Sequence, residues 1–159
     1  MPIATPEQIK RYEMAPSLVI ATLEGLDEAH MQQRPAEGEW TIHEIVIHLA
    51  DSETMGHWRL RKTLAEADSI LPIYDEAAWA QKLSYHSQER TLALTLFSSL
   101  RASTAALLHM LPAESWELTS THPERGKITV YDLFNIYLEH GELHLQQIER
   151  IKQLFSTIA

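Results

Sequence analysis

Apolar and polar positions alternate along this chain with a helical period almost throughout. In four long segments the apolar residues recur every three or four positions, which is the pattern of helices that bury one face. This pattern predicts long helices over residues 5–26, 41–67, 87–110 and 129–155. A shorter helix is expected at residues 74–79, and a short turn at residues 27–31.

Capping and breaking residues indicate where these helices begin and end. Thr41 and Glu44 stand three positions apart at the start of an apolar run, which is the signature of a capping box. Thr129 and Asp132 give a similar start to the last helix. Pro16 lies inside the first segment and is expected to kink or divide that helix, because proline has no amide donor.

The connections between the helices show little extended pattern. Runs of β-branched residues bounded by turns are scarce, and residues 116–127 are interpreted as a polar connection. We therefore expect an all-α protein, a four-helix bundle with short extra helices in its connections. Residues 1–159 are a suitable length for a single domain with one core.

Composition and charge narrow the possible functions. A formal net charge of -9 argues against a nucleic-acid partner, which would need a basic surface. The chain has no cysteine, so disulfides, thiolate ligands and thiol nucleophiles are excluded. The N-terminus has no signal-peptide pattern, and no apolar run reaches the ~18 residues of a membrane span. These features predict a cytoplasmic protein without a membrane partner.

Two histidines near the end of the chain have the spacing of helical metal ligands. His140 and His144 are four residues apart, so their rings project from one face of a helix, and they lie on its apolar stripe. Two buried imidazoles each need a partner, since burying an unpaired polar group costs roughly 1–3 kcal/mol. One alternative is a pair of satisfied core histidines; the other is a shared metal ion. His48, on the flank of the second long helix, could be a third ligand, but the residue pattern leaves open whether it faces the pair.

Several neighbouring polar residues have an ordinary explanation. Glu142 lies in the third place of His140-Gly141-Glu142-Leu143-His144, whereas the metalloprotease motif has glutamate directly after the first histidine. Asp51 and Glu53 are expected to be charges on the surface of a helix. His43 is expected to be a surface histidine.

The residues that could carry chemistry occur as an ordered set of motifs. They are Trp40-Thr41-Ile42-His43-Glu44, His48-Leu49-Ala50-Asp51-Ser52, Arg59 with Arg61, Tyr74-Asp75-Glu76 with Trp79, His122-Pro123, and His140 with His144 before Gln147-Ile148. In this order they resemble the DinB-like superfamily, and within it the YfiT-like metal-dependent hydrolases. The resemblance implies a four-helix bundle with one metal ion held by His48, His140 and His144.

The resemblance also implies an enzyme that uses a divalent metal, for which zinc, nickel, iron and manganese all suit imidazole ligands. The chain is similar both to hydrolases that use metal-bound water and to bacillithiol-dependent S-transferases. We favour transfer of a low-molecular-weight thiol to an electrophile, because the matches at Tyr74-Asp75-Glu76 and Arg59 are to that branch. A non-enzymatic, metal-binding dimeric bundle is a further alternative.

Individual roles follow less directly from the resemblance. The candidates are Asp51 and His122 for catalysis, and Arg59, Tyr74 and Trp79 for the wall of a substrate pocket. The YfiT-like pattern often carries a further histidine where this chain has Glu53, a position outside the three ligands. We expect a small-molecule substrate and a homodimer.

Overall fold

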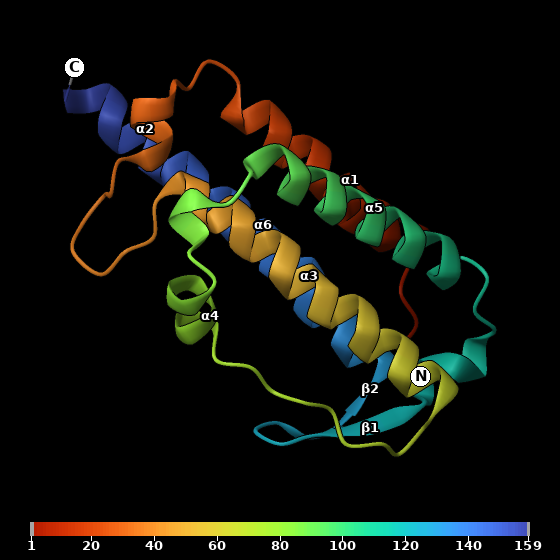
Figure 1. Ribbon diagram of the computed structural model, residues 1–159. Helices are drawn as coiled ribbons and strands as arrows, with labels where there is room; N and C mark the ends of the chain where they lie inside the picture. Colours follow the sequence, from red (N-terminus) through yellow and green to blue (C-terminus); the bar gives the residue numbers. More distant parts are fainter. Residues whose placement is uncertain (1, 159) are drawn as a thin grey trace.

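Four long helices make up most of the computed structural model, which describes residues 2–158 and the side chains through residue 155 (Figure 1). They are α1 (Pro6–Leu23), α3 (Ile42–Ala65), α5 (Arg90–Leu108) and α6 (Val130–Ile158). The connections contain two short helices, α2 (Glu28–Gln32) and α4 (Glu76–Lys82), and two 3-10 turns, η1 (Tyr85–Ser87) and η2 (Ala113–Glu117). The predicted bundle with short extra helices is therefore confirmed.

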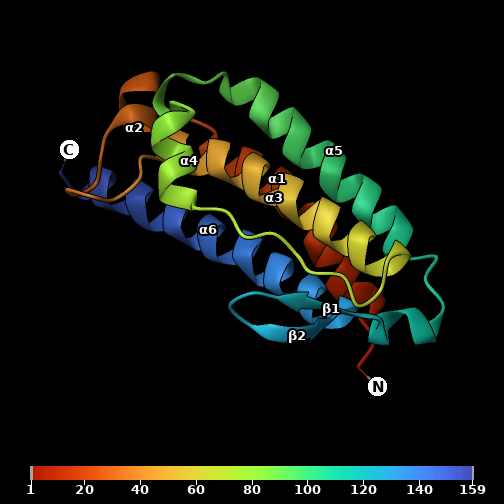
Figure 2. The same cartoon turned by 60° about the horizontal axis from the view of Figure 1, so that its bottom comes forward.

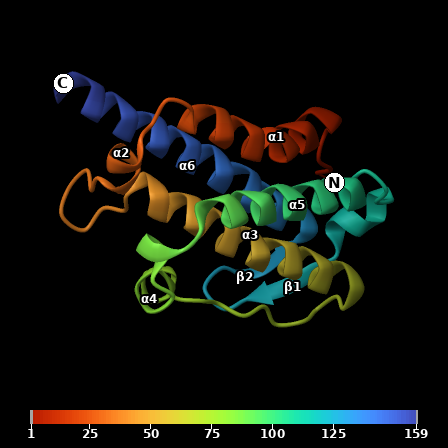
Figure 3. The same ribbon diagram turned by 45° about the horizontal axis from the view of Figure 1, so that its top comes forward.

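The four long helices lie alongside one another and enclose the core (Figures 2 and 3). Helix α3 packs against both α5 and α6, and α1 packs against the same two helices. One cluster of buried side chains, which includes Val19, Ile45 and Phe97, fills one half of the bundle. A second cluster, which includes Leu60 and Phe134, fills the other half.

The helix starts follow the capping residues that the sequence indicates. The Thr41 side chain accepts the Glu44 amide at 3.1 Å, and the Glu44 carboxylate accepts the Thr41 amide at 2.9 Å. This capping box satisfies two amides that a helix start would leave without partners. Of the two effects expected of Pro16, division of the helix is excluded, because α1 continues through Pro16 to Leu23 as one helix.

A β-hairpin stands where the sequence indicated only a polar connection, and that prediction is wrong. Strand β1 (Thr119–His122) pairs antiparallel with β2 (Gly126–Thr129). The turn between them needs Gly126, whose φ of +74° is a conformation that other residues rarely adopt. The segment after α3 lies beside β1, where the Leu71 amide donates to the Thr121 carbonyl at 2.9 Å. The hairpin lies next to α3 and α6 (Figure 2). Its residue His122 therefore lines a cavity together with residues of both helices.

A buried ion pair crosses the interior between α3 and α5. Arg101 Nε donates to Glu53 Oε2 at 2.8 Å, and the two side chains are 0% and 2% exposed. The expectation that Glu53 is a surface charge is therefore wrong; a bundle interior admits such a carboxylate because a guanidinium neutralises it there. Among the described helices, α5 alone has the length and hydropathy of a membrane span. It nevertheless contacts α1 and α3 and carries Arg101 in its buried face.

Candidate metal centre

Three histidines from two helices meet between α3 and α6. The Nε2 atom of His140 lies 3.1 Å from Nε2 of His48 and 3.1 Å from Nε2 of His144. The ligand atoms of all three lie within 4.8 Å of one another. The helix period brings His140 and His144 onto one face of α6, and the packing of α3 on α6 supplies His48, which is fully buried.

Two neighbouring side chains orient these rings. Gln147 Oε1 lies 2.8 Å from His144 Nδ1, and because an amide oxygen only accepts, Nδ1 carries the proton. The Nε2 atom of His144 therefore presents a lone pair to the centre of the cluster. The indole of Trp40 packs on His48 with 4.6 Å between ring centroids. The Nδ1 atom of His48 is buried and has no hydrogen-bond partner, so packing rather than an acceptor holds that ring.

The three imidazoles of the cluster are neutral at neutral pH, so their lone pairs are available to a metal cation. Burial and, to a lesser extent, the neighbouring imidazoles together lower the pKa of His48 to about 3 and that of His140 to about 2. Burial also lowers the pKa of His144. Three neutral imidazoles cannot satisfy one another here, because His140 Nε2 faces two nitrogens and can share only one proton. One divalent cation would accept all three lone pairs, so these residues fit a metal ion.

A small cavity of about 180 Å³ opens beside His140. Its lining comes from α3, α4, α6, the segment before α4, and the hairpin: Ser52, Arg59, Ile73, Tyr74, Glu76, His122, Glu124, Arg125, Leu133, Ile136, Tyr137 and His140. The hairpin contributes three of these residues, so one wall of the cavity is formed by strands that the sequence pattern does not predict. Two of the three pocket candidates, Arg59 and Tyr74, do line the cavity.

Arg59 and two tyrosines give the cavity its polar interior. Arg59 is 8% exposed; its Nη1 donates to the Tyr137 hydroxyl at 2.9 Å, and its Nε donates to the Pro72 carbonyl at 3.2 Å. The Tyr74 hydroxyl is buried without a hydrogen-bond partner of good geometry. Burial raises the pKa of Tyr74 and of Tyr137, and the Ser52 side chain acts in the opposite direction on Tyr74. Both phenols therefore stay protonated at neutral pH.

His122 reaches the cavity from β1, where it is 7% exposed. Its Nδ1 accepts the backbone amide of Glu124 at 3.3 Å, so the proton of the neutral ring lies on Nε2. Burial lowers the pKa of His122, and the positive charge of Arg59 lowers it further. His122 thus presents a neutral ring with an N–H donor at neutral pH.

The structure does not bring Asp51 and Trp79 into this lining. Asp51 accepts the Tyr85 hydroxyl at 2.7 Å and faces η1 and α5, which places it outside the cavity beside His140. Burial raises the pKa of its carboxyl. Trp79 packs behind Tyr74, with 4.7 Å between ring centroids. Asp51 is three residues from His48 on α3, but its carboxylate is held by the Tyr85 hydroxyl and does not reach the cavity beside His140.

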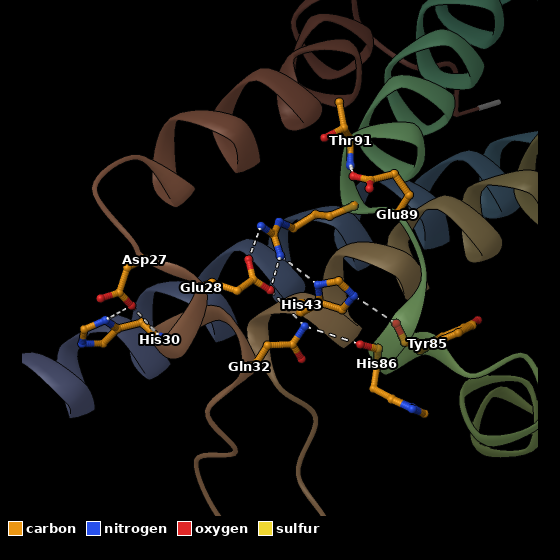
Figure 4. A network of polar contacts seen from close by, with 10 residues as sticks. Asp27, Glu28, His30, Gln32, His43, Tyr85, His86, Glu89 and Thr91 are labelled. Carbon is orange, nitrogen blue, oxygen red and sulfur yellow. Dashed lines mark hydrogen bonds and ion pairs between the residues drawn. The ribbon is translucent and has the colours of Figure 1, made fainter.

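His43 is buried at 4% exposure, so its expected surface position is wrong. Figure 4 shows it between the start of α5 and η1. Its Nε2 donates to the Tyr85 carbonyl at 3.0 Å, which leaves Nδ1 to accept from Arg90 at 2.8 Å. Arg90 in turn pairs with Glu28 of α2 at 2.9 Å. This network anchors η1, whose Tyr85 ring has its centroid 6.5 Å from that of Trp40, the indole that packs on His48.

The fold and the site together define a four-helix bundle with a three-histidine cluster that fits a divalent metal and borders a small cavity. The chain belongs to the DinB superfamily, whose family model matches residues 11–148. The resemblance inferred from the sequence motifs is therefore confirmed.

Relatives and solved structures agree with this assignment. A protein of Oceanobacillus iheyensis, named a "putative metal-dependent hydrolase", is 31% identical over 142 residues, which cover 89% of this chain and 82% of the relative. A protein of Halalkalibacterium halodurans with the same description is 28% identical over 142 residues, with the same coverage.

Two solved structures share the fold. YfiT from Bacillus subtilis, described as "a probable metal-dependent hydrolase with an unusual four-helix bundle topology", superposes with a TM-score of 0.90 at 23% identity. The match covers 98% of this chain and 92% of YfiT. A mycothiol-dependent maleylpyruvate isomerase superposes with a TM-score of 0.70 at 12% identity, over 89% of this chain and 59% of the isomerase.

Proposed function

We propose that this protein is an enzyme in which His48, His140 and His144 hold one divalent metal ion. The observation that carries this proposal is the convergence of three lone-pair nitrogens, one of them on the wall of a cavity. Among the described residues, the cluster contains no fourth histidine and no carboxylate. Three protein ligands with an open position are typical of catalytic rather than structural zinc sites.

We propose further that the reaction transfers a low-molecular-weight thiol to an electrophile. A divalent ion supplies Lewis acidity, which lowers the pKa of a thiol or water that it binds. The isomerase with the same fold is described as mycothiol-dependent, which supports a thiol as co-substrate. The residues of this chain would bind and orient the substrate. Arg59 and Tyr74 would donate hydrogen bonds to it inside the cavity, and His122 holds a proton on Nε2.

Hydrolysis is the second candidate, and the names of the sequence relatives favour it. It requires a group that takes a proton from water. His122 is poorly suited to that role, because Nδ1 already accepts the Glu124 amide and Nε2 already carries a proton. The carboxylates that line the cavity are those of Glu76 and Glu124. If the protein is a hydrolase, replacing Glu76 or Glu124 should abolish hydrolysis. If it transfers a thiol, the same replacements should leave that activity in place.

Metal analysis of the purified protein tests the ligand assignment. We expect one divalent ion per chain in the wild type, and loss of that ion in His144→Ala. The matched control is His109→Ala, which changes an exposed histidine directly after the end of α5 and should keep full occupancy. A wild type that binds no metal even after reconstitution refutes the site and the enzyme together. Unchanged metal content in His144→Ala refutes the ligand set.

A substrate panel decides between the two activities. The metal-loaded protein is incubated with a series of low-molecular-weight thiols and a generic electrophile, and separately with ester and amide substrates. We expect thioether formation that depends on the metal and on the thiol. Ester or amide cleavage without added thiol would instead establish the hydrolase, and neither activity would favour the non-enzymatic bundle.

We also propose that the protein acts in the cytoplasm as a homodimer. The dimer is supported by exposed apolar side chains on α1, Met14 and Leu18, which line a groove of about 460 Å³ between α1 and α6. Light scattering coupled to size-exclusion chromatography measures the assembly directly. A monomer at micromolar concentration would remove this part of the proposal.

A further inference from the structure

The interior of the cavity contains an arginine without a counter-ion. Arg59 is 8% exposed, yet none of the ion pairs among the described residues includes it. Buried charges are normally paired, because removing an ion from water costs several kcal/mol. Arg101 illustrates the normal case in this same bundle, since it is buried against the carboxylate of Glu53. Arg59 therefore differs from the other buried arginine in lacking an anion.

The hydrogen bonds of Arg59 position its guanidinium and leave part of it free. Nε and Nη2 both donate to the Pro72 carbonyl, and Nη1 donates to the Tyr137 hydroxyl. A guanidinium has five N–H groups, so one on each terminal nitrogen remains without a partner here. These contacts also fix the plane of the group, because they hold it from α6 and from the segment before α4. A rigid guanidinium with two free donors is well suited to bind a carboxylate in two places.

Other donors surround the same space. The Tyr74 hydroxyl lines the cavity, is buried and lacks a partner. The neutral ring of His122 carries its proton on Nε2, and the charge of Arg59 is close enough to lower its pKa. The two carboxylates of the lining, Glu76 and Glu124, belong to exposed residues, so water weakens their charge compared with that of buried Arg59. They still act on the donors: Glu76 contributes to the raised pKa of Tyr74, and Glu124 partly opposes the lowering of the pKa of His122. The buried part of the cavity thus offers donors and one positive charge.

The remaining walls and the size limit the ligand further. Ile73, Leu133 and Ile136 supply apolar surface beside the polar groups. The volume of about 180 Å³ is below the ~300 Å³ of ordinary small-molecule sites, so the part of the ligand that enters is small. A short carbon chain that ends in a carboxylate matches both the apolar side chains and the polar groups of the cavity.

We propose that Arg59, with Tyr74 and His122, binds the carboxylate of a small organic substrate beside His140. The inference rests on the proposed function, because the bound carboxylate serves the reaction by holding the substrate next to the metal. The anion site itself depends on Arg59 and can be tested separately. It identifies the substrate as a small carboxylic acid rather than a neutral molecule.

The test measures binding of butyrate, and of its neutral isostere butyramide, to the zinc-loaded protein by NMR titration. We expect butyrate to bind and butyramide to bind at least about tenfold more weakly, because the amide lacks the charge that a buried arginine recognises. Arg59→Gln should weaken butyrate binding at least about tenfold. Arg61→Gln is the matched control, since Arg61 contacts His57 and Ser103 outside the cavity, and it should bind as the wild type does.

A second variant covers the case in which Arg59→Gln does not fold, which circular dichroism reveals. Tyr74→Phe keeps the ring and removes the unpartnered hydroxyl, and it should weaken butyrate binding about two- to tenfold without affecting butyramide. Unchanged butyrate affinity in the folded Arg59→Gln protein, or in Tyr74→Phe where Arg59→Gln does not fold, refutes the proposal. Tighter binding of inorganic phosphate than of butyrate would also overturn the carboxylate assignment.

The outcomes separate this inference from the proposed function. Zinc content is measured on every sample. Butyrate that binds wild type and folded Arg59→Gln equally, with zinc present in both, lies on the metal, so the anion site fails and the metal centre stands. If the wild type holds no zinc, the titration is made on the protein as purified. Binding that then disappears in Arg59→Gln keeps the anion site while the metal-dependent function fails.

Discussion

Replacing Arg101 by methionine should destabilise this protein more than any other single arginine change on a described helix. The variant removes the guanidinium but keeps an unbranched apolar chain in its place. Glu53, 2% exposed, would then keep only the hydrogen bond from the Tyr12 hydroxyl. Two backbone carbonyls, those of Tyr12 and Tyr137, would each lose a donor that now lies at 2.9 and 2.6 Å.

The expected magnitude follows from this geometry. Removing one partner of a buried ion pair costs about 3–5 kcal/mol, because the remaining charge is uncompensated. Whole domains are stable by only about 5–15 kcal/mol, so the change should remove a large share of the total. Arg11 offers a matched comparison: its pair with Glu142 at 2.5 Å is exposed, with 50% and 34% of the two side chains accessible. Arg11→Met should cost about 1 kcal/mol or less.

Urea denaturation followed by circular dichroism measures both variants. A second arm, Arg101→Met with Glu53→Gln, removes both charges, and we expect it to be less destabilised than the sum of the single changes by at least about 1 kcal/mol. The reasoning is refuted if Arg101→Met costs no more than Arg11→Met. Strict additivity in the double variant would show that the two residues do not act as an ion pair.

Three further predictions concern the site and its support. Gln147→Leu should lower metal affinity about 10- to 100-fold, because Gln147 fixes the proton of His144 on Nδ1. Competition with a chelator measures the affinity. The control variant Gln146→Leu, at an exposed position, should bind metal as the wild type does. The metal-free protein should lose stability as pH falls below about 6.5, because burial lowers the pKa of His43 and of the three clustered histidines, so the unfolded state binds more protons in this range. Urea midpoints at pH 7.5 and 5.5 measure this, and an equal or higher midpoint at pH 5.5 contradicts it. Gly56→Ala should destabilise the bundle by about 1–3 kcal/mol and displace Tyr137, since the added carbon would lie 2.6 Å from that ring. A thermal melt indistinguishable from wild type would show that the ring can move without cost.

The elements were largely predictable because their signals are local. Apolar residues every three or four positions identify a helix without knowledge of its partners, and the pair Thr41 and Glu44 marks a start within one turn. The hairpin was missed because its strands are four residues each and carry polar threonines. Their pairing depends on a turn at Gly126 and on contact with the segment after α3, neither of which gives a periodic pattern.

By itself, the sequence determined the helices and the shared face of His140 and His144, since helix geometry relates residues four apart. It also carried the ordered motifs that assign the chain to its superfamily. Only the tertiary structure placed His48 against His140, 92 residues away, and paired Glu53 with Arg101. It also directed Asp51 to the Tyr85 hydroxyl, away from the cavity. The physical reason is that these contacts depend on how one helix packs on another, which the period of a single helix does not encode.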